Sequence, residues 1–343
     1  MMSEDFFANK VVILAGAGGF IGSNLTDKLL ELGAKVIGID NFITGKEVNL
    51  EKAKEHENFQ LQKIDLNDQA ALMTTLEQAK EKYGQIDVFL HFASPASVPG
   101  YQTHPVETYL VNSIATHNIL AWLKANSPET RFLFASTSEV YGNPQVHPQV
   151  ETYWGNVNPN GPRSCYDESK RLGETICGVF HRDFGMNTRI IRIFNTYGPR
   201  MDLDDGRILP QFIKQVKMGA KLTVYGDGSQ TRSYCFVSDL VEGILRFVAA
   251  DGLAGETVNL GNPGEFTVLE TAKIVNEVMG RSEDMITFAP LPKDDPMRRQ
   301  PDISKAKKLI DWEPVVPFAD GLTQMLQFYG LLSGEKEAKT DNS

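Results

Sequence analysis

The chain has 343 residues, of which 41% are hydrophobic and 23% charged, with a formal net charge of −10. This is the composition of an ordinary globular protein, and the length predicts one large α/β unit or two lobes. The acidic balance argues against a nucleic-acid partner, because phosphates require a basic face. No stretch approaches the ~20 apolar residues of a membrane-spanning helix, so we expect no membrane partner. Three scattered cysteines favour neither a metal site nor a disulfide framework and predict a reduced, cytoplasmic setting.

Strand and helix patterns alternate over the first two hundred residues. "KVVILAG", at residues 10–16, is rich in β-branched residues and runs into glycines, as a buried parallel strand does. Helical spacing follows and is closed by Gly33. Further strand patterns are "KVIGID", "FQLQKIDL", "IDVFLHFA", "TRFLFAST" and "TRIIRIFN", with helical stretches near 68–82, 106–125 and 166–184. The alternation predicts βαβ units and an α/β fold with a doubly wound parallel sheet.

Beyond residue 200 the pattern breaks into shorter pieces, which predicts a second, smaller lobe. We expect a nucleotide-binding Rossmann domain over residues 1–200 and a mainly substrate-binding lobe over 201–330. Within that lobe, residues 235–262 are expected to return to the first domain. Residues 331–343 are polar and are expected to form a tail.

Glycines recur at three-residue intervals between the first strand and the first helix. Gly16, Gly19 and Gly22 allow a tight turn and the close approach of a pyrophosphate to the helix N-terminus. The spacing is G-x-x-G-x-x-G rather than the commoner G-x-G-x-x-G, and a glycine triplet alone is also compatible with a structural turn. Asp40 ends the second strand 18 residues after Gly22, where a carboxylate accepts hydrogen bonds from a ribose and repels a 2′-phosphate. This context predicts a dinucleotide site that favours NAD over NADP.

Tyr166 and Lys170 lie four residues apart in "SCYDESKRLGE", and therefore on one face of the predicted helix. The alternative to a catalytic pair is that the two side chains form an ordinary exposed pair on the helix surface. Beside a nucleotide, the cation is expected to lower the pKa of the tyrosine. In "FASTSEVYG", the end of the preceding strand supplies hydroxyl groups and a carboxylate for proton transfer or positioning, unless they serve only the turn.

The glycine spacing and the Y-x-x-x-K pair resemble the short-chain dehydrogenase/reductase superfamily in its extended, sugar-nucleotide-modifying branch. The runs "ASTSEVYGNPQVHPQVETYWGNVNPNGPRSCYDESKR", "RIFNTYGPRM" and "DDPMRRQPDISKAKKLIDWEP" are similar to UDP-glucuronate decarboxylases, and the likeness extends over about residues 10–330. It implies an enzyme that converts UDP-glucuronate to UDP-xylose through a 4-keto intermediate. It further implies bound NAD as a catalytic cofactor and a homodimer.

The resemblance also implies roles for individual residues. Thr137 would hold the sugar 4-hydroxyl with Tyr166 as its base, and Arg299 would lie near the substrate carboxylate rather than be a solvated charge. The catalytic set is Thr137, Ser138, Glu139, Tyr166, Lys170 and Arg299. The cofactor-binding set is Gly16, Gly19, Phe20, Ile21, Gly22, Asp40, Asn41, Asp65, Leu66, Ala93, Asn112, Tyr166, Lys170 and Thr196. The substrate-binding set is Tyr101, Asn195, Arg207, Tyr225, Arg232 and Arg299. For Asp65, a cap on the following helix is the alternative to an adenine contact.

Three residues depart from the family pattern: Leu110 replaces a lysine, Ser169 a glycine and Asn160 an aliphatic residue. The loss of a cation at Leu110 is compatible with a different pose of an acidic sugar or with a neutral sugar. A UDP-sugar 4-epimerase, a sugar-nucleotide 4,6-dehydratase and a non-catalytic NAD-binding regulator therefore stay open. A standard dehydratase carries an Asp-Glu pair where this chain has Ser138 and Glu139, and regulators often lose the tyrosine or the lysine.

Overall fold

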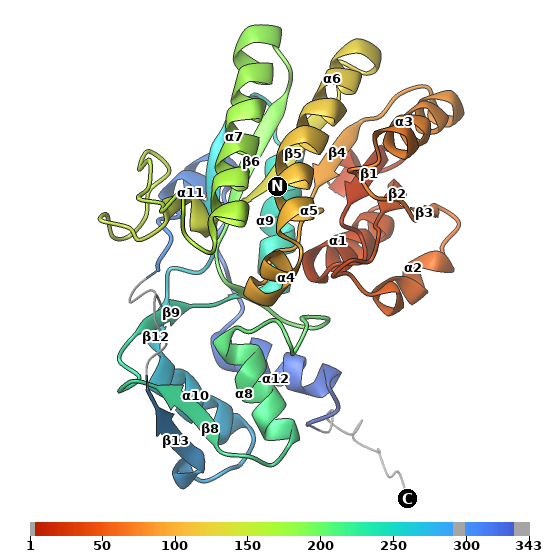
Figure 1. Ribbon diagram of the computed structural model, residues 1–343. Helices are drawn as coiled ribbons and strands as arrows, with labels where there is room; N and C mark the ends of the chain where they lie inside the picture. The colour runs from red at the N-terminus through yellow and green to blue at the C-terminus, as the bar shows by residue number, and fades with distance from the viewer. Residues whose placement is uncertain (1–3, 291–298, 333–343) are drawn as a thin grey trace, which may run out of the picture.

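The computed structural model describes residues 4–290 and 299–332, which form two lobes (Figure 1). A seven-stranded sheet, every strand parallel to its neighbours, forms the centre of the larger lobe, in the order β11-β6-β5-β4-β1-β2-β3. Its strands are β1 (Val11–Ala15), β2 (Lys35–Ile39), β3 (Phe59–Gln62), β4 (Val88–His91), β5 (Arg131–Thr137), β6 (Thr188–Ile193) and β11 (Thr257–Leu260). The predicted doubly wound parallel sheet is confirmed.

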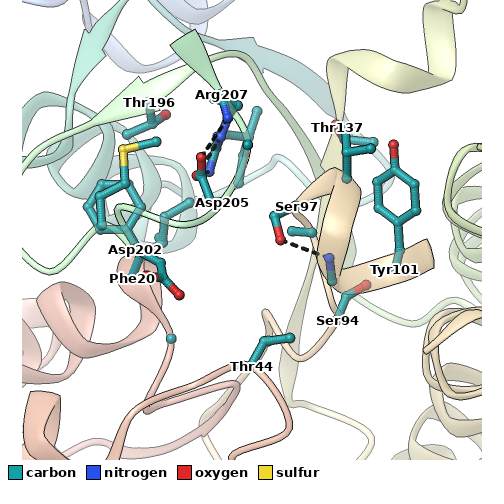
Figure 2. Close-up of a pocket in the computed structure, with 18 of the residues that line it drawn as sticks. Phe20, Thr44, Ser94, Ser97, Tyr101, Thr137, Thr196, Asp202, Asp205 and Arg207 are labelled. Atoms are coloured by element: carbon teal, nitrogen blue, oxygen red, sulfur yellow. Dashed lines mark hydrogen bonds and ion pairs between the residues drawn. The ribbon is translucent and has the colours of Figure 1, made fainter. Parts of the chain in front are cut away.

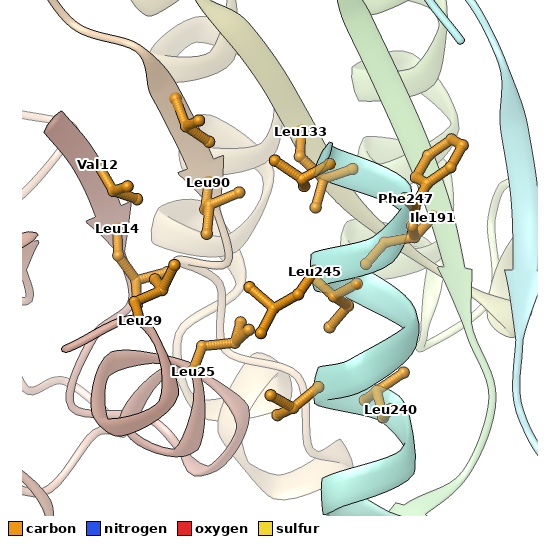
Figure 3. Close-up of a cluster of buried hydrophobic side chains, with 14 of the residues drawn as sticks. Val12, Leu14, Leu25, Leu29, Leu90, Leu133, Ile191, Leu240, Leu245 and Phe247 are labelled. Atoms are coloured by element: carbon orange, nitrogen blue, oxygen red, sulfur yellow. The ribbon is translucent and has the colours of Figure 1, made fainter. Parts of the chain in front are cut away.

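Helices cover both faces of this sheet. One face carries α1 (Phe20–Glu31), α9 (Val237–Ala249) and α11 (Ser304–Ile310); the other carries α3 (Gln69–Tyr83), α6 (Thr116–Asn126) and α7 (Ser164–Phe184). The alternation of β1 explains the two layers, because Val12 and Leu14 pack toward α1 and α9 while Ile13 lies in the opposite core (Figure 3). Burial of each such side chain contributes about 1.5–3 kcal/mol. These two apolar layers fix the positions of the strands, and with them the carboxyl ends of the strands at which the candidate site lies.

The smaller lobe has its own core between helices and short strand pairs. β8 (Leu222–Tyr225) pairs with β13 (Ile286–Ala289), and β9 (Thr231–Ser233) pairs with β12 (Glu265–Thr267). The helices are α8 (Ile208–Lys217), α10 (Val268–Val278) and α12 (Phe318–Phe328). The chain returns to the larger lobe through β10 (Cys235–Phe236), which pairs with β7 (Thr196–Tyr197), and then through α9 and β11. Of the expected polar tail, residues 333–343 lie outside the described residues.

The helix expected near residues 106–125 is interrupted. The structure has α4 (Val98–Thr103), α5 (Pro105–Leu110), a π-helical turn over Val111–Ala115 and then α6. The Val111 carbonyl contacts His91 Nε2 at 3.1 Å, and the Asn112 carbonyl faces Gly173 of α7, where a Cβ atom would lie 2.8 Å away. Helical periodicity alone does not reveal such a wide turn, because packing against α7 and β4 fixes it.

Buried Arg189 and partly buried Arg131 bind the backbone carbonyls at the C-terminus of helix α9. Arg189 Nη1 donates to the carbonyls of Val248 at 3.0 Å and Ala250 at 2.8 Å, and Arg131 Nη1 donates to the same part of the backbone. A cation at the C-terminus of a helix satisfies orphan carbonyls and complements the helix dipole. These hydrogen bonds fix the C-terminus of α9, the helix through which the chain returns from the smaller lobe, against the sheet of the larger lobe.

Arg189→Met is therefore expected to lower the free energy of unfolding by about 3 kcal/mol, since buried carbonyls lose charged donors. Denaturant unfolding followed by circular dichroism measures the change. Exposed Arg182→Met is the matched control and is expected to stay within about 0.5 kcal/mol of the parent. Equal stabilities for the two variants would contradict the capping role.

Candidate active site

A cavity of about 790 Å³ lies between the two lobes. Its walls come from the glycine turn before α1, the end of β5, the start of α7 and, from the second lobe, α8 and β9. Figure 2 shows Arg207 and Asp205 of the second lobe across the cavity from Thr137 and Tyr101. Both lobes therefore supply side chains to one chamber at the carboxyl ends of the parallel strands, the usual ligand site of such sheets.

The glycine turn is shaped for close backbone approach. Gly16 has a φ of +84°, and a Cβ atom there would lie 2.7 Å from the Ala93 amide nitrogen. A Cβ atom at Gly22 would lie 1.9 Å from the Gly16 carbonyl oxygen. No side chain caps the start of α1 at Gly19, so its first amide groups face the cavity together with Phe20 and Ile21. This arrangement fits a pyrophosphate at a helix N-terminus.

The acidic side chains after β2 and β3 lie together at one end of this site. Asp40 accepts hydrogen bonds from the amides of Gly18 and Phe42, each at 2.7 Å, and burial raises its pKa. Asn41 donates to Asp65 at 3.0 Å. A smaller cavity of about 70 Å³ is lined by the expected adenosine residues Asp40, Asn41, Asp65, Leu66 and Ala93. Asp65 does not cap the next helix; Asp68 does, and accepts from the Ala71 amide at 3.1 Å.

Tyr166 and Lys170 lie on one buried face of α7, as the spacing predicts. Their residues are 5% and 3% exposed, and Lys170 Nζ donates to the Ala135 carbonyl at 2.7 Å. Burial raises the pKa of Tyr166, while its hydrogen bond with Thr137 opposes the rise. The lowering of the Tyr166 pKa by Lys170, which is expected beside a bound nucleotide, stays a prediction. Burial also lowers the pKa of Lys170 to about 7.

Glu139 is the centre of an ionic cluster beside Tyr166. Arg163 and Arg299 each form an ion pair with one of its carboxylate oxygens. Burial opposes ionisation, but the two guanidinium groups hold the pKa of Glu139 below its ordinary value. The Arg299 side chain is only 9% exposed, so it is not a solvated surface charge. Sequence reasoning missed Arg163; its place one helical turn before Tyr166, at the start of α7, is the signal that could have found it.

Most of the other expected site residues line the large cavity, whereas Tyr225 does not. Those that line the large cavity are Ser138, Tyr101, Asn195, Thr196, Arg207 and Arg232. The Tyr101 ring stacks on Tyr166 with 5.1 Å between centroids, and Arg207 Nε donates to Asp205 at 2.7 Å. Tyr225 is not among the residues that line the cavity, and its hydroxyl accepts from Gln211 at 3.2 Å.

The three departures from the family pattern lie in different places, and of these Ser169 contacts Asn112. The Asn112 amide donates to Ser169 at 3.1 Å and to Ser94 at 3.0 Å, so the hydroxyl at Ser169 binds a buried amide. Asn112 itself does not line the cavity, and neither does half-buried Leu110 at the end of α5. Asn160 is exposed in the loop before α7. Leu110 therefore supplies no side chain to the cavity wall.

Two further findings concern the described residues, 4–290 and 299–332. No helix among them is long and apolar enough to cross a membrane. They also contain no group of three or more His, Cys, Asp or Glu side chains that could hold a metal ion.

The parallel sheet, the glycine turn and the Tyr166–Lys170 pair together define an extended short-chain dehydrogenase/reductase. Residues 13–325 match the family model described as GDP-mannose 4,6 dehydratase. The chain is 45% identical to UDP-glucuronic acid decarboxylase 1 of Danio rerio, covering 97% of this chain and 75% of the relative. It is 47% identical to UDP-glucuronic acid decarboxylase 2 of Arabidopsis thaliana, covering 92% of this chain and 67% of the relative. The chain belongs to the UDP-glucuronic acid decarboxylase family.

Solved structures of related enzymes share the fold. UDP-glucuronic acid 4-epimerase of Bacillus cereus, in complex with UDP-glucuronic acid and NAD, is 29% identical with a TM-score of 0.80, covering 94% of this chain and 99% of that one. Epimerase Mth375 of Methanothermobacter thermautotrophicus is 29% identical with a TM-score of 0.83, covering 96% and 95%.

Proposed function

We propose that this chain is an enzyme that decarboxylates UDP-glucuronate to UDP-xylose through a 4-keto intermediate, with NAD as a bound catalytic cofactor. The observation that carries the proposal is the pair of guanidinium groups, Arg163 and Arg299, on the cavity wall beside Tyr166. A neutral hexose has no group that needs two cations there, whereas a hexuronate carries a carboxylate at C6. The identity to relatives named UDP-glucuronic acid decarboxylase supports the same substrate.

The residues present fit NAD. The uncapped α1 N-terminus and the glycine turn suit its pyrophosphate, and Asp40 suits the hydroxyl groups of the adenosine ribose. Lys170, one helical turn after Tyr166, is the residue we assign to the second ribose. When bound, NAD would take hydride from C4 of the sugar and return it after carbon dioxide has left.

The chain's own residues handle the protons and the charge. Tyr166 removes the proton of the sugar 4-hydroxyl, and Thr137, hydrogen-bonded to Tyr166, holds the same oxygen. A ketone at C4 is β to the C6 carboxylate, so the bond from C5 to C6 breaks with its electrons delocalised onto the C4 oxygen. The phenol and the Thr137 hydroxyl stabilise that oxyanion. A proton added at C5 gives a 4-keto pentose, and Tyr166 returns its proton to the C4 oxygen when the ketone is reduced to the pentose.

Incubation with a panel of nucleotide sugars, followed by mass spectrometry, tests the proposal. UDP-glucuronate is expected to lose carbon dioxide and give a UDP-pentose, while UDP-glucose and UDP-N-acetylglucosamine stay unchanged. An intact UDP-hexuronate of inverted C4 configuration, detected by proton nuclear magnetic resonance because the two epimers have the same mass, would identify a 4-epimerase instead. Loss of water would identify a 4,6-dehydratase, which Ser138 in place of an aspartate disfavours.

Asp40 is expected to set the cofactor preference, because its carboxylate repels a 2′-phosphate. The apo-protein is expected to bind NAD at least about tenfold more tightly than NADP, and Asp40→Ala to narrow that gap. Fluorescence titration of both nucleotides measures the two affinities. The control is Asp251→Ala, which changes a carboxylate with a 90% exposed side chain. Equal affinities in the parent protein would contradict the ribose assignment.

The proposal includes a homodimer packed through α5, the π-helical turn and α7. Three apolar side chains on these elements are exposed: Tyr109 at 44%, Ile114 at 55% and Leu172 at 49%. An apolar surface of this kind supports a second copy as its partner. A cytoplasmic location is also proposed and is supported by three free cysteines, since a reducing compartment keeps thiols unpaired.

Leu172→Glu is expected to convert the dimer to monomer, because a carboxylate would be buried in an apolar contact. Sedimentation velocity gives the mass of each form. Val48→Glu, at a side chain that is 60% exposed on the other part of the lobe, is expected to leave the dimer intact. A monomeric parent protein would refute this arrangement.

A further inference from the structure

The charges around Glu139 do not cancel. Arg163 and Arg299 are both paired with this one carboxylate, and all three residues line the cavity. With Glu139 ionised, the cluster carries one excess positive charge. A fourth ionisable group, Asp167, lies near it, and the mechanism above assigns that residue no task.

Asp167 is a buried carboxyl group on the first turn of α7. The residue is 7% exposed, follows Tyr166 directly and lies four positions after Arg163, on the same helix face. Its Oδ1 atom is buried and has no hydrogen-bond partner in the described part of the chain. An ionised carboxylate in that position would be costly, because burial without full pairing disfavours charge.

Asp167 is one of several residues at this end of α7 that have unpartnered buried polar atoms. Besides Asp167 Oδ1, these atoms include the Nε atoms of Arg163 and Arg299 and the hydroxyl of Tyr101, all buried. Native proteins rarely leave such atoms unsatisfied, and water or ligand oxygens usually complete them. The Nε atoms of Arg163 and Arg299 are buried without a partner, so the hydrogen bonds to Glu139 do not satisfy the two guanidinium groups fully.

The surroundings of Asp167 place its titration near neutral pH. Burial and then the charge of Glu139 raise the pKa of Asp167 to about 7; Arg163 and Arg299 oppose the rise, and Glu168 adds to it. The other ionisable groups near Asp167 are Tyr101, Cys165 and Tyr166. His104 and Lys170 line the same cavity, so an experiment must separate their effects from that of Asp167.

We propose that Asp167 determines how tightly the cavity binds a carboxylate-bearing sugar. Protonated Asp167 leaves the cluster of Arg163, Arg299 and Glu139 with a net positive charge, and ionised Asp167 cancels that charge. This inference rests on the proposed function, because it takes a hexuronate as the substrate. Asp167 acts through the arginines and is a positioning and specificity-determining residue rather than a catalytic one.

The linkage between proton binding and ligand binding gives the direction and the size of the pH dependence of affinity. A bound carboxylate favours the protonated form of Asp167, so binding takes up a proton, and affinity falls as pH rises through the Asp167 titration. One unit of charge near the bound carboxylate, in a partly buried site, is expected to change the affinity about tenfold between pH 6 and pH 8.5. A sugar without a carboxylate is expected to show little of this dependence.

The test uses NAD-loaded protein with Tyr166→Phe, which stops turnover and leaves Asp167 in place. Isothermal titration calorimetry at pH 6 to 8.5, in two buffers of different ionisation enthalpy, measures affinity and proton uptake. UDP-glucuronate is expected to bind about tenfold more weakly at the upper pH and to take up a fraction of a proton near neutrality. UDP-xylose, which shares the nucleotide and diphosphate, is expected to do neither.

Adding Asp167→Asn is expected to make UDP-glucuronate binding independent of pH and as tight as at pH 6. Asp183→Asn, the same chemical change at an exposed residue near the C-terminal end of α7, is expected to keep the parent behaviour. An unchanged pH dependence in the Asp167→Asn protein would overturn the proposal and point to His104 or Lys170.

If the Asp167→Asn protein does not fold, the comparison of UDP-glucuronate with UDP-xylose on protein that retains Asp167 still tests the proposed role of Asp167. Equal pH dependence for UDP-glucuronate and UDP-xylose would overturn the inference. The protein with native Tyr166 tests the proposed function separately. Failure to decarboxylate UDP-glucuronate would refute that function. Normal decarboxylation without proton uptake on UDP-glucuronate binding would refute only the role of Asp167.

Discussion

Tyr166→Phe is expected to lower kcat for UDP-glucuronate by about two orders of magnitude or more while NAD binding stays within about twofold. The phenylalanine ring keeps the stacking on Tyr101, at 5.1 Å between centroids, but removes the hydroxyl that takes the proton of the sugar 4-hydroxyl. Lys170, held by the Ala135 carbonyl at 2.7 Å, does not replace it, since its ammonium is directed to the backbone.

Single-turnover measurements of carbon dioxide release, on protein loaded with NAD, give the size of the loss. Tyr83→Phe makes the same chemical change at the end of α3, away from the cavity, and is expected to leave kcat unaltered. Turnover of the Tyr166→Phe protein within about threefold of the parent would remove Tyr166 from the mechanism.

Arg299→Ala is expected to reduce kcat/KM for UDP-glucuronate by about two to three orders of magnitude. The change removes a cation from the proposed carboxylate site and leaves buried Glu139 with Arg163 as its remaining ionic partner. Breaking one side of a buried ion pair also costs about 3 kcal/mol of stability, so the variant is expected to unfold at lower denaturant concentration. Activity must therefore be measured below that transition.

The comparison of ligands separates specificity from damage. Binding of UDP-xylose, which has no carboxylate, is expected to weaken by no more than about threefold in the Arg299→Ala protein. The control is Lys305→Ala, which changes a partly exposed lysine six residues after Arg299 that forms an ion pair with Glu256. This variant is expected to keep full activity. Equal losses for both ligands would make Arg299 a diphosphate or structural residue.

Short sequence motifs correctly predicted the parts of the site that depend on residues close together in the chain. The parallel strands, the glycine turn and the spacing from Tyr166 to Lys170 depend on residues close together in the chain, and the structure places them as expected. The π-helical turn over Val111–Ala115 was not predicted, because contacts with His91 and with α7 determine it. Such contacts join segments that are distant in sequence.

Electrostatics was the least predictable part of the site. Burial of the phenol raises the pKa of Tyr166, and the spacing of Tyr166 and Lys170 in the sequence does not reveal that effect. The pairing of Arg163 with Glu139 was also missed, since the two residues lie 24 positions apart and meet only when the loop between them folds back. Burial and long-range pairing depend on the whole fold.

Nuclear magnetic resonance of the product formed in D₂O tests the central claim most directly. Decarboxylation leaves C5 to be protonated from solvent, so the UDP-xylose is expected to carry one deuteron at C5. Hydride returned from bound NADH is the substrate's own, so C4 is expected to keep its protium. A UDP-hexuronate that retains its carboxylate and has no deuterium at C5 would contradict the account, because it would mean that the site oxidises and reduces C4 without breaking the bond from C5 to C6.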